Sequence, residues 1–177
     1  VVVRDEKTYV FTTTNNPIIL FEEDTIRTLS YTAVVLTNRN QDQVFLGENA
    51  IVQLKKWQNN GKLGSFRILF GKFLVKKASG NTGSSFNIRT ATAMIGIKGP
   101  LGSGETNNNF TSLSNFSGNM SFVDNQGNAI QVPVGNFGYN TDGIDSNIGL
   151  AKIKNFNSQK SDEEKEKNYT KQLNTKD

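Results

Sequence analysis

Short runs of alternating apolar and polar residues fill much of this chain. The clearest runs lie at residues 66–77 (FRILFGKFLVKK) and 86–99 (FNIRTATAMIGIKG). A period of two is typical of a strand with one buried and one exposed face. Glycine or asparagine turns separate such runs at intervals of about 8–12 residues, as in sandwiches, barrels and solenoids. The pattern predicts strands in both segments and favours an all-β protein.

Weaker runs predict further strands on both sides of this centre. Residues 8–14 and 31–37 are rich in β-branched and aromatic side chains, and residues 44–57 hold two apolar runs. Farther along, residues 116–123 and 129–135 flank the turn sequence DNQGN, which predicts a hairpin. No repeat of fixed period is visible, so two architectures stay open: a solenoid-like β-roll of short strands, or a sandwich.

The change of composition along the chain divides it into three segments. We expect an N-terminal strand segment at 1–17, the β domain at 18–156 and a polar, charged tail at 157–177. The tail mixes acidic and basic residues, so it is either disordered or a short helix. Within the domain, residues 102–109 (GSGETNNN) are expected to form a flexible polar loop.

Composition narrows the chemistry that the chain can perform. It contains no histidine and no cysteine, which excludes Ser-His-Asp and Cys-His catalysis and every thiolate or imidazole metal site. Residues 140–147 (NTDGIDSN) gather oxygen donors, but their spacing does not match a calcium loop. No carboxylate pair is evident, so we expect a protein without enzymatic activity, metal or cofactor. No apolar run reaches the roughly 18 residues of a membrane span.

Basic residues concentrate in the middle of the chain. Nine lysines and arginines, and no acidic residue, lie between residues 51 and 100. The candidate anion-binding patch consists of Lys55, Lys56, Lys72, Lys76, Lys77, Arg89 and Lys98. Interleaved aromatics are what a polyanion-binding surface requires, but the alternation also fits a solvated strand face above a core, which we favour. An anionic envelope polymer is therefore a weaker candidate partner, and no nucleic acid is expected.

Five segments in a consistent order resemble the FecR-like domain, an exported bacterial all-β domain of iron-transport regulators and envelope proteins. They are residues 23–36 (EDTIRTLSYTAVVL), 46–54 (LGENAIVQL), 69–75 (LFGKFLV), 86–99 and 118–135. The positions matched to the family motif are Asp24, Gly71, Thr90, Gly96, Lys98 and Gly99. Glu23 stands where the family has glycine, Ala91 where it has proline, and Lys98-Gly99-Pro100 where it has Arg-Gly-Thr.

This resemblance implies a non-catalytic module in the periplasm or on the surface of a bacterium. Such a module would bind another envelope protein through an edge or a face of its sheet. The alternative is a structural subunit whose copies assemble into a filament or envelope layer by strand addition, with residues 9–14 as the donor segment. Self-association that grows with protein concentration would separate the two.

Overall fold

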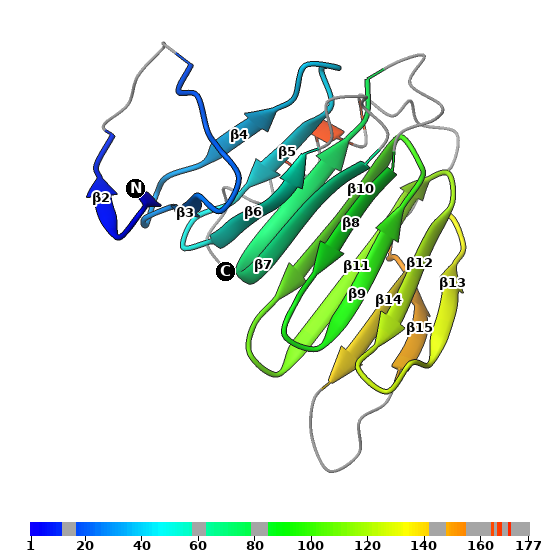
Figure 1. Cartoon of the computed structure of the whole chain (residues 1–177). Coiled ribbons are helices and arrows are strands. Elements are labelled where there is room, and N and C mark those ends of the chain that lie inside the picture. Colours follow the sequence, from blue (N-terminus) through cyan, green and yellow to red (C-terminus); the bar gives the residue numbers. More distant parts are fainter. Residues whose placement is uncertain are drawn as a thin grey trace.

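The computed structural model is nearly all β, which confirms the predicted fold class. It describes residues 1–11, 17–57, 63–78, 85–141 and 148–154, together with Glu164, Glu166, Lys167 and Thr170, and for residues 56, 57, 63 and 64 the backbone alone. The strands form one open hydrogen-bonded network that folds into two facing layers (Figure 1). Within this described part, no helix has the length and apolar character needed to cross a membrane.

Each layer is a row of short strands, and β7 belongs to both. The front layer runs in the order β2 (Lys7–Tyr9), β1 (Val2–Arg4), β3 (Thr25–Arg27), β6 (Ile51–Trp57), β7 (Leu63–Lys76), β8 (Ser85–Arg89), β9 (Ala93–Ile97), β12 (Met120–Asp124) and β13 (Ala129–Val132). The back layer runs in the order β4 (Val34–Thr37), β5 (Gln43–Leu46), β7, β10 (Leu101–Thr106), β11 (Phe110–Ser117), β14 (Asn136–Thr141) and β15 (Ile148–Lys152). Of the pairings between these described strands, only that of β7 with β8 is parallel. The architecture is therefore nearer to a sandwich than to a solenoid.

The crossing of β7 from one layer to the other takes place at Gly71. Residues before this glycine pair with β6 and β8, and residues from Gly71 onward pair with β10. Gly71 has a φ of 111°, and a Cβ there would lie 2.6 Å from the Cβ of Ala50. Only glycine fits both the backbone conformation and the space, which explains why the motif has glycine here.

The main core fills the space between the layers. Phe66, Phe86 and Phe122 come from the front layer and Phe73 from the back layer, and all four side chains are fully buried. The rings of Phe66 and Phe86 stack with their centroids 5.8 Å apart. Phe66 and Phe86 occupy the alternate positions that the residue pattern predicts to be buried. Phe70, in the same phase as Phe66, is 43% exposed, and Phe73 is buried on the opposite phase, because β7 changes layers at Gly71.

A second, smaller cluster lies on the outer face of the back layer. It contains Leu74, Leu101 and Phe116, with Ile153 packed against it. Near it, Lys76 forms an ion pair of 2.6 Å with Glu166 of the tail. The four described residues of the tail have helical backbone, which is in line with the helical alternative for this segment.

The predicted loop at residues 102–109 is wrong, because most of it is β10, an interior strand paired with both β7 and β11. The glycines of β10 explain why the sequence pattern resembles that of a loop. Gly102 faces Met120 of the front layer and Gly104 faces Phe73, and a Cβ at either position would collide with those side chains. The glycines thus make room for large core residues, whereas the sequence pattern of glycine and polar residues suggested flexibility.

The structure also modifies other predicted elements. The hairpin around residues 124–128 is confirmed as the pair β12–β13. The single run expected at 116–123 is divided by a turn at Gly118 between β11 and β12. The N-terminal segment is part of the front layer, since β1 pairs with β3. Of the strand expected at 8–14, residues 8 and 9 belong to β2, and residues 12–14 lie outside the described residues.

Candidate functional site

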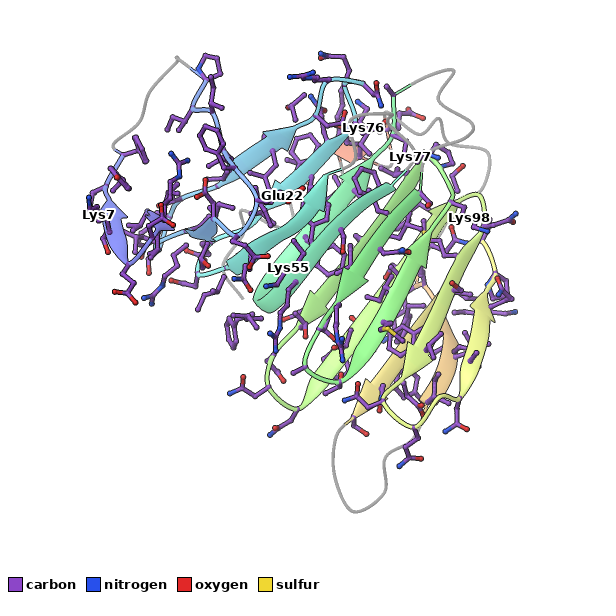
Figure 2. The ribbon with its side chains drawn as sticks, viewed as in Figure 1. Lys7, Glu22, Lys55, Lys76, Lys77 and Lys98 are labelled. Atoms are coloured by element: carbon purple, nitrogen blue, oxygen red, sulfur yellow. The ribbon has the colours of Figure 1, made fainter. Side chains whose placement is uncertain are left out.

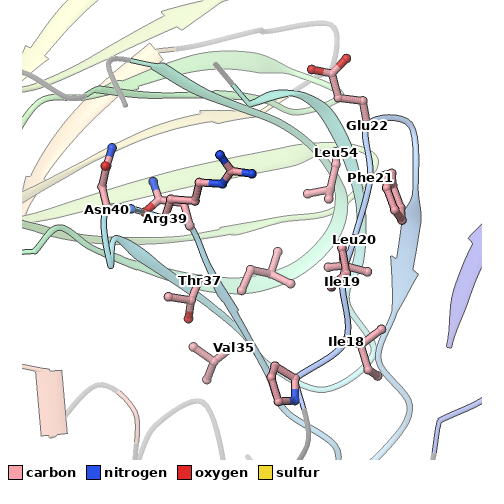
Figure 3. A pocket seen from close by; sticks show the side chains of 13 residues that line it. Ile18, Ile19, Leu20, Phe21, Glu22, Val35, Thr37, Arg39, Asn40 and Leu54 are labelled. Carbon is pink, nitrogen blue, oxygen red and sulfur yellow. Dashed lines mark hydrogen bonds between the residues drawn. The ribbon is translucent and has the colours of Figure 1, made fainter. Parts of the chain in front are cut away.

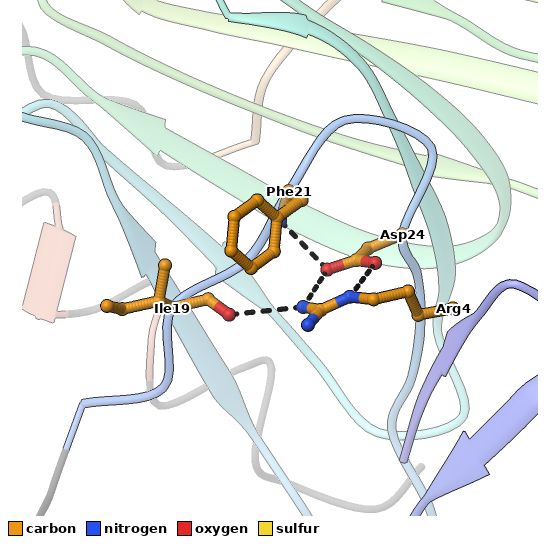
Figure 4. Close-up of polar contacts among 4 residues, drawn as sticks. All are labelled: Arg4, Ile19, Phe21 and Asp24. Atoms are coloured by element: carbon orange, nitrogen blue, oxygen red, sulfur yellow. Dashed lines mark hydrogen bonds and ion pairs between the residues drawn. The ribbon is translucent and has the colours of Figure 1, made fainter.

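The motif aspartate, Asp24, holds the N-terminal hairpin against the segment that precedes β3. Its side chain is only 1% exposed. Arg4 of β1 donates from Nε to Oδ1 at 2.7 Å and from Nη2 to Oδ2 at 2.6 Å, and the backbone N–H of Phe21 donates to Oδ2 at 2.8 Å (Figure 4). The hydrogen bonds from Arg4, reinforced by that of Phe21, hold the pKa of Asp24 below its ordinary value despite burial.

Arg4 also fixes the course of the chain at residues 17–22. Its Nη2 donates to the carbonyl oxygen of Ile19 at 3.2 Å, and its guanidinium lies over the ring of Phe21 at 4.3 Å from the centroid. These contacts hold residues 19 and 21 in place, while Leu20 between them packs against the main core. The Arg4–Asp24 pair is therefore structural, and it positions the segment 17–22 that forms one side of a groove.

The groove lies between the segment 17–22 and β4, and has a volume of about 760 Å³ (Figure 3). Its lining residues are Pro17, Ile18, Ile19, Leu20, Phe21, Glu22, Val35, Leu36, Thr37, Asn38, Arg39, Asn40 and Leu54. Consecutive residues of a strand point to opposite faces, so a groove that touches Val35, Leu36 and Thr37 runs along the edge of β4.

This groove is apolar and open to solvent. Ile19 is 76% exposed, Phe21 57% and Val35 48%. Among the described strands, β4 pairs with β5 alone, so its other edge has no strand beside it. An exposed strand edge with apolar side chains next to it is a template for pairing with another chain. Arg39 and Glu22 supply one charge of each sign among the lining residues.

The other motif positions are structural as well. Glu23, which stands at the family's glycine, has a φ of 68°, the left-handed conformation that glycine adopts without strain. A Cβ at Gly99 would collide with the backbone of Ser117, and one at Gly96 would lie 2.6 Å from the Oγ of Ser121. Lys98 is exposed, and its backbone N–H donates to the carbonyl oxygen of Asn119 at 2.9 Å.

Thr90 belongs to a buried cluster of hydroxyl groups that joins the layers. Its Oγ1 accepts from the backbone N–H of Ala93 at 3.0 Å and lies 2.8 Å from the Oγ1 of Thr111, a residue of β11. Thr92 donates to the same Thr111 oxygen at 2.7 Å, and Thr106 of β10 lies 2.9 Å from it. The cluster ties the β8–β9 turn of the front layer to the β10–β11 hairpin of the back layer.

The residues of the candidate basic patch do not form one surface. Lys55 lies on the outer side of the front layer, where its Nζ is 2.6 Å from Glu23. Lys72 and Lys76 flank Leu74 on the outer side of the back layer. Figure 2 shows Lys55, Lys76 and Lys98 at separate places on the molecule. The side chain of Lys56 lies outside the described residues.

Two members of that set differ from the others in their surroundings. Lys77 is buried, which lowers the pKa of its ammonium group, although Asp42 acts in the opposite direction. Its Nζ donates to the carbonyl oxygen of Lys98 at 3.4 Å. Arg89 is exposed on the front layer and directly adjoins Arg67 in the neighbouring strand.

Several carboxylates of the described residues have identified structural partners. Asp24 and Glu23 form ion pairs with Arg4 and Lys55, and the Oε2 of Glu48 accepts from the backbone N–H of Tyr31 at 2.7 Å. No group of three acidic side chains in the part of the chain that is described could hold a metal ion. Both aspartates of the segment at 140–147 lie outside the described residues.

The groove does not follow from the alternating pattern, but the sequence contains one signal for it. Residues 18–21 are four consecutive apolar residues without alternation, a pattern that fits neither a half-buried strand nor a solvated loop. The position of this run beside β4 involves Arg4, which binds the carbonyl oxygen of Ile19 and lies far from the run in the sequence, so the residue pattern does not connect the two. The residue pattern does not predict that Arg67 and Arg89 are adjacent, because their adjacency depends on the register of β7 and β8.

Comparison with known proteins gives a shared fold. No protein-family model matches the chain, and no curated protein does. Two crystal structures of a "putative anti-sigma factor" from Parabacteroides distasonis ATCC 8503 are similar, each with a TM-score of 0.61 at 11% sequence identity. Each match covers 72% of this chain and 59% of that chain, so this chain spans less than two thirds of that protein. The similarity is therefore one of fold, shared with a protein whose structure is described as that of a "putative anti-sigma factor".

Proposed function

We propose that this chain is a non-catalytic protein-interaction module, exported by a bacterium to the periplasm or cell surface, that binds an extended segment of a partner protein along β4. One observation carries this proposal: an unpaired strand edge and an apolar groove occur at the same place. An added strand gains affinity from main-chain hydrogen bonds and specificity from pockets for alternate side chains. The groove and the edge supply these two components.

The hydrogen-bond pattern indicates which residues of β4 would pair with the partner. The backbone N–H of Asn38 donates to the carbonyl oxygen of Asp42 at 3.1 Å. Hydrogen-bonded and non-hydrogen-bonded pairs alternate along an antiparallel ladder, so the even-numbered residues of β4 form the hydrogen-bonded pairs with β5. Leu36 therefore bonds to β5, while the N–H and C=O groups of Val35 and Thr37 point to the open edge. Those two residues would form the ladder with the bound segment.

Two further points support the proposal. The fold shared with a protein described as an anti-sigma factor favours a regulatory role that works through protein binding. The resemblance to the FecR-like domain favours an exported protein of the bacterial envelope, and a chain without cysteine is compatible with an oxidising compartment.

The test uses proline as a blocking residue at the edge. A phage-displayed library of extended ten-residue peptides is selected on the full chain, and enriched peptides are measured against Val35→Pro and Thr37→Pro. Since neither outward N–H takes part in pairing with β5, proline there leaves the existing ladder intact. We expect alternating apolar peptides to be enriched and to bind the proline variants at least tenfold more weakly, while Val35→Thr, which keeps the N–H, binds within about threefold.

Equal binding to wild type and both proline variants would refute the proposed edge, and so would a selection without enrichment. The alternative, a self-assembling subunit, uses the same edge with a second copy as the donor. Light scattering over a wide range of protein concentrations separates them: a constant monomer mass supports the module, and a mass that grows with concentration and is returned to the monomer by Val35→Pro supports the subunit.

A further inference from the structure

A row of outward-facing side chains crosses the front layer at right angles to its strands. Gln53 of β6 pairs with Arg67 of β7, Arg67 pairs with Arg89 of β8, and Arg89 pairs with Met94 of β9. The residues that flank the two arginines along their strands, Phe66, Ile68 and Ile88 among them, are buried in the core. The row therefore points away from the core, on a face that has no residue in common with the groove at β4.

Arg67 and Arg89 are immediate neighbours in this row. Their strands lie side by side in the one parallel pairing among the described strands, which brings the two side chains to the strand spacing of about 4.8 Å. Like charges placed directly opposite each other destabilise a sheet. Neither arginine has an acidic side chain within ion-pair distance among the described residues. Glu23, which reaches this face, is bonded to Lys55 and Gln53 instead.

The two arginines make no identified contact that stabilises the fold. They are, however, well placed to bind a ligand. A guanidinium group is a planar fork that matches a carboxylate, so two neighbouring forks fit two carboxylates a few ångströms apart. Glutamates four residues apart on a helix have this spacing, about 5–6 Å. Met94, which is 50% exposed, adds an apolar contact beside Arg89. Arginine and methionine are enriched at protein interfaces and lysine is depleted, which favours a protein over a charged polymer as occupant.

We propose that Arg67, Arg89 and Met94 form a second docking surface, which receives an acidic helical segment of a partner protein through paired carboxylates. The inference goes beyond the edge of β4 and does not depend on it. Its closing experiment uses different residues, so failure of one proposal leaves the other standing.

The experiment measures binding of a fluorescein-labelled, alanine-based helical peptide by fluorescence anisotropy, with glutamates at positions i and i+4 in two successive pairs. A second peptide has glutamine in place of glutamate. The full chain is compared with the double variant Arg67→Gln/Arg89→Gln. The matched control, Arg27→Gln/Lys98→Gln, removes the same amount of charge from exposed positions of the front layer outside this row. Because all four side chains are exposed, circular dichroism is expected to show the same folded spectrum for each variant.

We expect the wild-type chain to bind the glutamate peptide at low salt and at least tenfold more tightly than the glutamine peptide. The Arg67/Arg89 variant should bind the glutamate peptide about tenfold more weakly, and the matched control within about threefold of wild type. Equal losses in both variants would show a general effect of net charge and overturn the proposal, as would no binding by wild type. Arginine-dependent binding of polyphosphate without binding of the peptide would overturn it in favour of an anionic polymer.

Discussion

Removing the negative charge of Asp24 is expected to destabilise the protein strongly at neutral pH and little at low pH. Asp24→Asn keeps the shape of the side chain but leaves Arg4 facing a neutral amide across the contacts at 2.6 and 2.7 Å. Breaking a buried pair by removing one charge costs about 3–5 kcal/mol. Because Arg4 is partly exposed and water can solvate it, we expect the lower end, about 3 kcal/mol at pH 7.

The pH dependence follows from the direction of the pKa shift. The pKa of Asp24 is lower in the folded protein than its ordinary value of 3.8, so the folded state favours the carboxylate. The stabilisation is therefore complete above about pH 5 and is lost as the pH falls below 3.8 toward the folded pKa. Asp24→Asn has no such titration, so the difference in unfolding free energy between wild type and variant must shrink in that range.

Urea unfolding at pH 7, 5, 4 and 3 measures this difference at each pH. Other carboxylates also titrate in this range; one is Asp124, whose pKa is lowered by its hydrogen bonds with Asn128. They are present in both proteins, so their contributions to the difference cancel. A matched variant, Glu22→Gln, removes an exposed carboxylate nearby and is expected to change stability by less than about 0.5 kcal/mol. A difference between wild type and Asp24→Asn that stays constant from pH 7 to pH 3, or that is below 1 kcal/mol throughout, would refute the reasoning.

The remaining predictions concern the backbone and the buried hydroxyl cluster, and each is measured by urea unfolding. Glu23→Gly should be about 1 kcal/mol more stable than Glu23→Ala, since only alanine retains the cost of a positive φ; equal stability would contradict this. Gly71→Ala should cost about 3 kcal/mol or more, and Ala50→Gly should restore the part due to contact between the two Cβ atoms; independent effects would count against that contact. Thr111→Val leaves three hydroxyls without a shared partner and should cost about 2–3 kcal/mol, whereas a neutral effect would mean that the cluster contributes little.

The sequence predicts those parts of this fold that depend on neighbours along the chain. The alternation in β7 and β8 identifies Phe66 and Phe86 as buried, and DNQGN identifies a hairpin. It fails at Phe70, which is in phase with Phe66 but 43% exposed, because β7 changes layers at Gly71. β10 could not be found in this way, because its glycines are explained by Met120 and Phe73 of other strands. The two candidate surfaces could not be predicted for the same reason, because each depends on residues far apart in the sequence. The groove depends on the contact of Arg4 with Ile19, and the arginine row on the parallel pairing of β7 with β8.

The motif residues and the proposed binding residues are different sets. The resemblance therefore concerns residues that maintain the fold and not residues that would contact a partner. Asp24, Gly71 and Thr90 act through an ion pair, a backbone crossing and a hydroxyl cluster, all inside the molecule. Val35 and Arg67 project from it and make no identified contribution to the core. A chain can therefore keep the fold while changing its partner, because substitutions at exposed edge and face positions cost little stability. It follows that the proline and arginine variants should unfold within about 0.5–1 kcal/mol of wild type while losing their ligands, whereas the motif variants should lose stability first.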